Sequence, residues 1–257
     1  MGAPFFDTHC HLQDPRFGAE FGAVLDRAHE HGVTHMVCCG TREDDWGRVL
    51  ELSRHHAAIL PMLGLHPWYA HEAKPGWLER LEVLLKNNAA GLGECGLDFA
   101  LEAPDRPLQE AVFRSQIRLA VKLNRPLSIH CRRAWEPLAT LAREEGLPPA
   151  GAVVHAFSGS AEVARELQAL DFHLSFACSL ANPANHRGAK AVRAVAEDRL
   201  LFETDAPDMS PIPGTLNEPA NIHRVAEAAA RLRGTDLETT AALAYRNSER
   251  LFGGLLP

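Results

Sequence analysis

The chain has no long apolar run and no excess of positive charge. No segment is hydrophobic enough over a sufficient length to span a bilayer, and no apolar stretch follows a basic start, so we expect a soluble cytoplasmic protein with no membrane partner. The formal net charge of −7 argues against a protein that wraps long duplex nucleic acid, because such binding depends on many Lys and Arg contacts to phosphate. A small or end-bound phosphate substrate is compatible with this charge.

Closely spaced cysteine pairs are also missing. The six cysteines are scattered without a Cys-x-x-Cys motif, and a chain of 257 residues does not need disulfides for stability. We therefore expect reduced, buried thiols. Cys10, Cys95 and Cys131 each neighbour a candidate metal ligand, but adjacent residues of an extended strand face opposite sides, so their thiols are predicted to point away from the site.

Apolar runs alternate with longer amphipathic stretches along the whole chain, without a linker, repeat or low-complexity tract. Strands that are apolar on both faces, each followed by a helix-length segment, are typical of a parallel sheet covered on both sides. The pattern predicts one α/β domain over residues 1–257, a (β/α)8 TIM barrel. The predicted strands are residues 4–9, 33–39, 58–64, 89–94, 126–131, 152–156, 172–176 and 199–203, and the predicted helices include 19–31, 77–87, 108–123, 161–170, 184–196, 218–232 and 236–251.

Two histidines, His9 and His11, stand at the end of the first predicted strand. On an extended strand, residues i and i+2 point to the same side, so the two imidazoles would converge. One His-x-His pattern is a weak signal, but other metal-competent side chains also fall where predicted strands end. Because the C-terminal strand ends of a barrel meet at one rim, we expect the following side chains to gather there: His9, His11, Glu94, His130, His155 and Asp205.

This set of donors predicts a centre with two divalent ions. Four imidazoles and two carboxylates exceed what one tetrahedral ion needs, and a glutamate among histidines suits a bridge between cations about 3.5–4 Å apart. Zinc or manganese fits such donors best, and magnesium is less suited. We assign His9, His11, Glu94 and Asp205 to one ion, and Glu94, His130 and His155 to the other.

A centre of this kind predicts hydrolysis, because paired cations activate water near neutral pH. Asp205 is placed to accept the proton of the water or to orient it, next to the bridging carboxylate of Glu94. His66 follows the third strand and either contacts a substrate oxygen or faces water as a loop histidine. Phosphate esters are favoured as substrates, although the same centre can polarise a carbonyl.

Other polar groups near the strand ends allow two interpretations. Arg132 and Arg133 either hold a second phosphate or are solvated at the start of a helix. Ser158 lies in a turn where helix amide groups either receive an anion or are capped by Ser158 or Ser160. Asp7 and Glu203 each precede a candidate ligand by two positions, and we expect them to orient it.

Six motifs follow one another along the chain: Asp7-Thr8-His9-Cys10-His11, Gly64-Leu65-His66-Pro67, Gly93-Glu94-Cys95-Gly96-Leu97-Asp98, His130, His155-Ala156-Phe157-Ser158-Gly159 and Glu203-Thr204-Asp205-Ala206-Pro207. In this order they resemble the motifs of the TatD family of metal-dependent hydrolases, within the amidohydrolase-like superfamily. The resemblance implies a barrel of the metal-dependent hydrolase type and a metal-dependent deoxyribonuclease that often trims DNA from a 3′ end, a 3′–5′ exodeoxyribonuclease. It also implies metal binding by the six residues above, with His66 near the scissile phosphate.

The loop after the eighth strand departs from the family pattern. Many members carry His, Arg and Lys before an Asn-Glu-Pro, whereas residues 210–216 contain no basic residue before Asn217-Glu218-Pro219, so we expect a weaker hold on phosphate. The leading hypothesis is a phosphodiesterase acting on single-stranded or frayed DNA ends. The alternatives are a binuclear hydrolase of a small phosphate ester, cyclic amide or lactone, and a non-catalytic metal-bound scaffold. The sequence does not indicate the oligomeric state.

Overall fold

All eight predicted strands are present and belong to one parallel sheet in the computed structural model, which describes residues 3–256. Each strand pairs with the next along the chain, so the spatial order is the sequence order. The strands are β1 (Phe5–Cys10), β2 (Val33–Cys39), β3 (Ile59–Leu63), β4 (Gly91–Asp98), β5 (Leu127–Arg132), β6 (Ala152–Val154), β7 (Phe172–Phe176) and β8 (Leu200–Phe202).

The sheet closes where the chain leaves β8 and passes β1. The backbone N–H of Asp205 donates to the His9 carbonyl over 2.9 Å. The N–H of His11 in turn donates to the Ala206 carbonyl over 2.7 Å. These bonds join the last strand to the first, and the predicted TIM barrel is confirmed as a nearly closed eight-stranded barrel.

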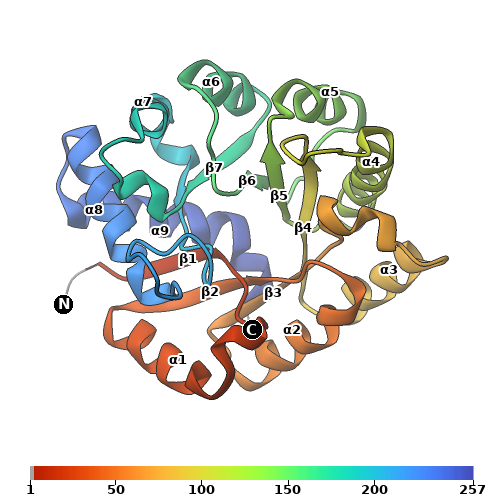
Figure 1. The fold of residues 1–257 in the computed structure, drawn as a ribbon, viewed down its shortest axis with the longest axis horizontal. Coiled ribbons are helices and arrows are strands. Elements are labelled where there is room, and N and C mark those ends of the chain that lie inside the picture. The colour runs from red at the N-terminus through yellow and green to blue at the C-terminus, as the bar shows by residue number, and fades with distance from the viewer. Residues whose placement is uncertain (1–2, 257) are drawn as a thin grey trace.

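Helices form an outer ring around the strands (Figure 1). Each turns an apolar stripe toward the sheet, as in α4, where Phe113, Ile117 and Ala120 recur at helical spacing and are buried. Within residues 3–256, no helix combines the length and the apolar character needed to cross a bilayer. The helices are α1 (Phe21–Glu30), α2 (Glu43–His55), α3 (Trp77–Asn87), α4 (Arg106–Leu123), α5 (Trp135–Glu145), α6 (Ala161–Ala169), α7 (His186–Ala194), α8 (Ile222–Arg233) and α9 (Leu237–Phe252), with the short 3-10 helices η1 (Pro15–Glu20), η2 (Pro67–Glu72), η3 (Cys178–Ala181), η4 (Glu197–Arg199), η5 (Pro219–Asn221) and η6 (Gly253–Leu255).

One cluster of buried side chains comes from β1, β2, β3, β6 and β8 and from the C-terminal segment of the chain. The Phe252 ring stacks on Phe6 of β1, with 6.0 Å between the ring centroids. Phe6 lies at the start of its strand, so the end of α9 covers the N-terminal end of the barrel, and the C-terminal strand ends are left to carry the polar side chains. The cluster contains Phe6, Val37, Cys39, Leu60, Met62, Val153, Leu201, Leu251, Phe252 and Leu255.

Two element boundaries differ from the sequence prediction by more than a residue or two. β4 does not end at Glu94 but runs to Asp98, because pairing with β5 resumes after an irregularity between Leu92 and Cys95. The helix expected over residues 218–232 begins only at Ile222, because residues Pro219–Asn221 form the separate 3-10 helix η5. Glu94 therefore lies within its strand rather than at the end of it.

Candidate metal centre

The six candidate ligands come together at the C-terminal rim of the barrel. β1 carries His9 and leads directly into His11, and β4 supplies Glu94. The other three stand at or just beyond strand ends: His130 in β5, His155 after β6 and Asp205 after β8.

Glu94 lies at the centre of the cluster, and its two carboxylate oxygens face different groups. Oε2 is 3.4 Å from Nε2 of both His9 and His11. Oε1 is 2.8 Å from Nε2 of His155 and 3.0 Å from Nδ1 of His130. The carboxylate thus divides the imidazoles into two sets, which is the arrangement expected of a ligand shared by two cations.

Asp205 lies on one side of the Glu94 carboxylate and His66 lies on the other. Oδ1 of Asp205 is 3.5 Å from Nε2 of His11, on the side of Oε2. Nε2 of His66 is 3.2 Å from Oε1 of Glu94, on the other side. Three groups of donor atoms lie within 4.8 Å of one another: His9, His155 and Asp205; His9, His11 and Glu94; and His66, Glu94 and His130. His155 therefore also stands beside His9, whereas the sequence analysis assigned it to the second ion alone.

The buried donor atoms fit a divalent cation. Nε2 of His9 is buried and has no hydrogen-bond partner among residues 3–256. A polar atom left in this state costs about 1–3 kcal/mol, which a bound cation would offset. The Cys39 carbonyl accepts a hydrogen bond from Nδ1 of His11 over 2.8 Å, so the proton that this ring must lose to bind a cation is the one on Nε2, which faces the cluster.

The two carboxylates expected to orient ligands act differently. Oε1 of Glu203 is 3.3 Å from Nδ1 of His155 and so contacts a candidate ligand ring. Asp7 instead accepts hydrogen bonds from the backbone N–H groups of Thr204 at 2.9 Å and of His9 at 3.3 Å. Asp7 therefore contacts the backbone on both sides of the junction between β1 and β8, where the barrel closes, and it does not contact an imidazole.

Asp98 is a site residue that the sequence analysis did not select. Its Oδ2 is 3.1 Å from Nε2 of His130 and accepts a hydrogen bond from Nε1 of Trp68 over 2.8 Å. This contact fixes the ring so that Nδ1 of His130 faces Glu94. The available signal was the Gly96-Leu97-Asp98 run, which the predicted strand omitted because it stopped at Glu94.

Two glutamines of α4 position the segments that carry His66 and Asp98. The side-chain amide of Gln116 accepts the N–H of Leu65 over 2.8 Å and donates to the Leu65 carbonyl over 3.0 Å. The Gln109 amide pairs in the same way with the backbone of Asp98, over 2.8 and 3.2 Å. The two glutamines are about two helical turns apart, so they project from the same face of α4.

The cluster forms the floor of a cavity of about 850 Å³. Arg42 and Arg132 stand at its rim, and the guanidinium of Arg42 lies over the ring of Tyr69, 4.5 Å from the centroid. Trp68 also lines the cavity and is 45% exposed, so one face of its indole is available to a planar ligand.

Of the other residues predicted to contact substrate, one lines the cavity and one does not. Ser158 lines the cavity, whereas Arg133, next to Arg132 in the chain, is not among the described residues that line it. The helix cap that was the alternative role for Ser158 is provided by Ser160, whose hydroxyl accepts the N–H of Val163 over 3.3 Å.

Elsewhere at the rim, Arg16 is fully engaged by carboxylates. Its Nη2 is 2.8 Å from Oδ2 of Asp14 and 2.7 Å from Oδ2 of Asp208. Asp208 belongs to the connection after β8, so the pair ties this loop to the loop after β1. No uncompensated positive charge from Arg16 faces the cavity on that side.

Comparison with known proteins identifies the family. The sequence model described as TatD related DNase matches residues 6–253. The chain belongs to the TatD family.

Relatives of this TatD-family chain are similar over nearly their whole length. The uncharacterized metal-dependent hydrolase YabD of Bacillus subtilis (strain 168) is 36% identical over 256 residues, covering 96% of this chain and 98% of YabD. The 3′-5′ ssDNA/RNA exonuclease TatD of Pantoea ananatis is 34% identical over 262 residues, with 96% and 99% covered. The crystal structure of the TatD homolog YjjV from Escherichia coli K12 is 30% identical and superposes with a TM-score of 0.92 over 97% of this chain and 98% of that one. The TatD-family chain is a metal-dependent hydrolase.

All six cysteines are buried and free, so the expected absence of disulfides is confirmed. Burial raises the pKa of the Cys10 and Cys95 thiols well above the ordinary value. The Sγ atoms of these two residues lie against the carbonyls of Val37 and Ser128, at 3.3 and 3.7 Å. Cysteine is absent from the groups of potential metal ligands found within residues 3–256.

The charges of this TatD-family centre shift pKa values in opposite directions. Burial raises the pKa of Glu94, but the surrounding imidazoles, first that of His66, outweigh burial and hold it well below the ordinary value. Burial lowers the pKa of His11, yet the carboxylates of Asp205 and Glu94 raise it to about 9. The pKa of His66 falls to about 4, chiefly through burial. At neutral pH the Glu94 carboxylate is therefore charged and the His66 ring is neutral.

We expect this TatD-family protein to bind divalent metal more tightly as the pH rises from about 6.5 to about 9. The pKa of His11 is raised to about 9 and that of His130 is also raised, so protons occupy imidazoles that must be free to bind a cation. Binding then releases protons, and affinity is gained as the pH rises through that window. Calorimetric titration with Zn²⁺ or Mn²⁺ in buffers of different ionisation enthalpy counts the protons; no release at neutral pH would contradict the expectation.

Replacing Asp98 by asparagine is expected to weaken metal affinity about 10–100-fold, the usual cost of removing a group that orients a metal-binding histidine. Asparagine keeps the size of the side chain but no longer holds the His130 ring with a negative charge. Metal affinity measured by competition with a chelating dye tests this, with Asp44→Asn as a matched control, because Asp44 is exposed and its carboxylate pairs with Lys74 at the surface. Equal affinities in the two variants would show that Asp98 does not position His130.

Proposed function

We propose that this protein is a divalent-metal-dependent 3′–5′ exodeoxyribonuclease that hydrolyses phosphodiester bonds at DNA ends with two bound ions. The observation that carries the proposal is the Glu94 carboxylate, whose oxygens face two separate groups of imidazoles at the floor of the cavity. A cavity of about 850 Å³ is of the size that accepts a nucleotide. The relative from Pantoea ananatis, named a 3′-5′ ssDNA/RNA exonuclease, supports both the substrate and the polarity.

The residues that would hold the ions fall into two sets that share Glu94. When bound, divalent ions in such a centre lower the pKa of water and offset negative charge on phosphate oxygens. Imidazole and carboxylate donors favour zinc or manganese over magnesium. His9, His11, Glu94 and Asp205 would hold one ion, and Glu94, His130 and His155 the other, with His155 close to both.

Asp205 would accept the proton of the attacking water. Burial raises its pKa, but the hydrogen bond with His11 and the charges of the other imidazoles lower the value below its ordinary range. The carboxylate is therefore charged at neutral pH and can take up a proton. The oxygen of the water forms a bond to phosphorus as one P–O ester bond of the phosphodiester breaks, and the ester oxygen that is released takes up a proton from solvent.

His66 would donate a hydrogen bond to the scissile phosphate. The backbone N–H of Trp68 donates to Nδ1 of His66 over 3.2 Å, so the neutral ring carries its proton at Nε2. Nε2 faces the Glu94 side of the cavity floor. The ring is thus a donor suited to a phosphoryl oxygen and a weaker candidate for a metal ligand than the other imidazoles.

Residues at the rim of the cavity would contact the rest of the DNA strand. Arg42 and Arg132 are exposed cations that line the cavity together with Trp68 and can contact neighbouring phosphates, while the indole stacks on a base. Asp14 and Asp208 also line the cavity and together outweigh the single positive charge of Arg16, so they would repel a continuing backbone. This asymmetry favours a substrate that presents an end over one that crosses the mouth.

Degradation of a 5′-labelled single-stranded oligonucleotide tests the proposal. With Mn²⁺ or Zn²⁺ we expect a ladder of labelled products that shorten progressively from the 3′ end, and slower degradation of a blunt duplex. A 3′-terminal phosphorothioate linkage should delay the ladder. Cleavage no faster than that by the Glu94→Gln variant would refute nuclease activity, and release of the 5′ label in the first product would reverse the polarity.

One observation favours a smaller substrate as the second candidate. The connection after β8 has no basic residue in residues 206–217, and its Asp208 neutralises Arg16. A protein with so little positive charge at one rim suits a small phosphate ester, a lactone or a cyclic amide. Turnover of bis(4-nitrophenyl) phosphate, a lactone or hydantoin at a kcat/KM well above that for the oligonucleotide would favour this candidate.

A further inference from the structure

A second cavity lies at the opposite end of the barrel from the metal centre. It has a volume of about 580 Å³, within the range of small-molecule sites. Gly151 directly precedes β6, His173 is the second residue of β7 and Arg199 directly precedes β8, so the cavity opens among the N-terminal strand ends. None of the residues that line it belongs to the metal centre.

His173 is the unusual group in this cavity. Its side chain belongs to a residue only 5% exposed, and neither ring nitrogen has a hydrogen-bond partner among residues 3–256. The Ala152 carbonyl lies near the ring but not in hydrogen-bond geometry. Buried imidazoles normally have a partner for at least one nitrogen, so a ligand that accepts or donates a hydrogen bond here would complete the site.

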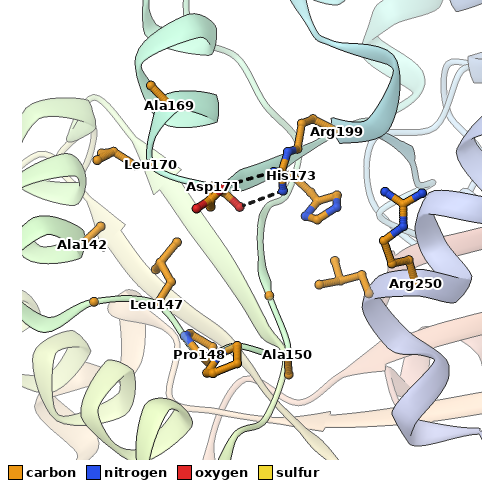
Figure 2. A pocket seen from close by; sticks show the side chains of 14 residues that line it. Ala142, Leu147, Pro148, Ala150, Ala169, Leu170, Asp171, His173, Arg199 and Arg250 are labelled. Carbon is orange, nitrogen blue, oxygen red and sulfur yellow. Dashed lines mark hydrogen bonds and ion pairs between the residues drawn. The ribbon is translucent and has the colours of Figure 1, made fainter.

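Two arginines flank the imidazole. Figure 2 shows the His173 ring between the side chains of Arg199 and Arg250, and the charges of both lower the pKa of His173 further after burial has lowered it. Arg199 is held by Asp171, with Nη2 and Oδ1 2.9 Å apart. Arg250 forms no ion pair within residues 3–256, so its guanidinium is free to bind an anion.

The rest of the wall is apolar. Leu147 and Pro148 approach from the loop after α5, and Leu170 and Leu251 from the ends of α6 and α9. One acidic side chain, Asp171, lies among the lining residues, and it is 81% exposed and already paired. Arg199 also lies 3.7 Å from Oδ2 of Asp198, so its charge is compensated, and the cavity offers an apolar wall beside the guanidinium of Arg250.

We propose that this cavity binds a small organic anion, an apolar body bearing one phosphate, phosphonate or carboxylate group. The anionic group contacts the guanidinium of Arg250 and one ring nitrogen of His173, and the body packs against the leucine and proline side chains. This site is independent of the metal centre and of the substrate proposed for it.

Binding of phenylphosphonate to the intact metal-loaded protein tests the proposal, because a phosphonate resists hydrolysis. Benzoate and inorganic phosphate, titrated separately, distinguish the preferred anionic group and the contribution of the apolar body. Amide NMR shifts locate the ligand, and we expect them around Gly151, His173 and Arg250. Shifts confined to the metal centre, or no binding below about 10 mM, would overturn the proposal.

Variants of the lining residues sharpen the test. Arg250→Gln is expected to weaken phenylphosphonate binding about tenfold or more, because a charge-assisted contact is lost. Arg246→Gln is the matched control, since Arg246 is also exposed on α9 but does not line the cavity. His173→Phe keeps a ring of similar shape without its nitrogens and is also expected to weaken binding. Unchanged affinity in either lining variant would contradict the proposed contacts.

Discussion

Glu94→Gln is expected to lower kcat/KM for the oligonucleotide about 1,000-fold or more, the upper range for loss of one preorganised charged group. Glutamine has the size of glutamate but carries no negative charge, so it cannot offset two cations. The two oxygens of Glu94 lie within 3.4 Å of five imidazoles, on two sides of the site. Losing the charge should therefore weaken both metal positions together.

Metal analysis and activity measured on the same samples separate the two effects of Glu94→Gln. We expect a lower metal content per chain together with the loss of hydrolysis. Glu136→Gln makes the same chemical change at an exposed position in the first turn of α5 and should retain activity. Full activity of Glu94→Gln would refute the assignment of Glu94 as the shared ligand.

Asp205→Asn is expected to lower kcat about 100–10,000-fold, the range associated with a positioned proton acceptor. The asparagine oxygen can still face His11, but the amide cannot take up a proton near neutral pH. Metal content should therefore fall far less than activity. This difference distinguishes Asp205 from Glu94, whose replacement removes both.

Steady-state kinetics and metal analysis test the role of Asp205. Asp26→Asn is a suitable control, because Asp26 is exposed on α1 and its replacement should leave kcat unchanged. If Asp205→Asn lost its metal in proportion to its activity, the role of Asp205 would be that of a metal ligand alone and not also that of the proton acceptor. If kcat were unchanged, another group would have to accept the proton.

Most of the barrel could be predicted from the sequence because its strands are continuous apolar runs separated by amphipathic segments. Residues 33–39 and 172–176 were predicted with the boundaries that the structure has. The end of β4 was missed because Gly93 and Gly96 interrupt the apolar run. At Gly96, where φ is 139°, an added Cβ would lie 2.0 Å from the His130 carbonyl oxygen, so the close approach of β4 and β5 requires glycine.

The gathering of the candidate ligands could be predicted because strand ends of a barrel share one rim, whereas the contacts between side chains could not. Arg132 and Arg133 are neighbours in the sequence, but only Arg132 lines the cavity, and Arg133 takes a positive φ of 52°. The pairing of Asp98 with His130 depends on the direction of two side chains from different strands. No local pattern of residues specifies such a direction.

The seam of the barrel has a consequence for how the protein would unfold. His9 and His11 stand on one side of the junction between β1 and β8, and Asp205 stands on the other, joined here by a few hydrogen bonds. An ion held by all three would link the two sides of the junction. Because these residues are far apart in the sequence, the link would close a long loop, for which the loop-closure entropy is large. Chelation should therefore accelerate amide exchange first in β1 and in the residues after β8, while β4 and β5 stay protected.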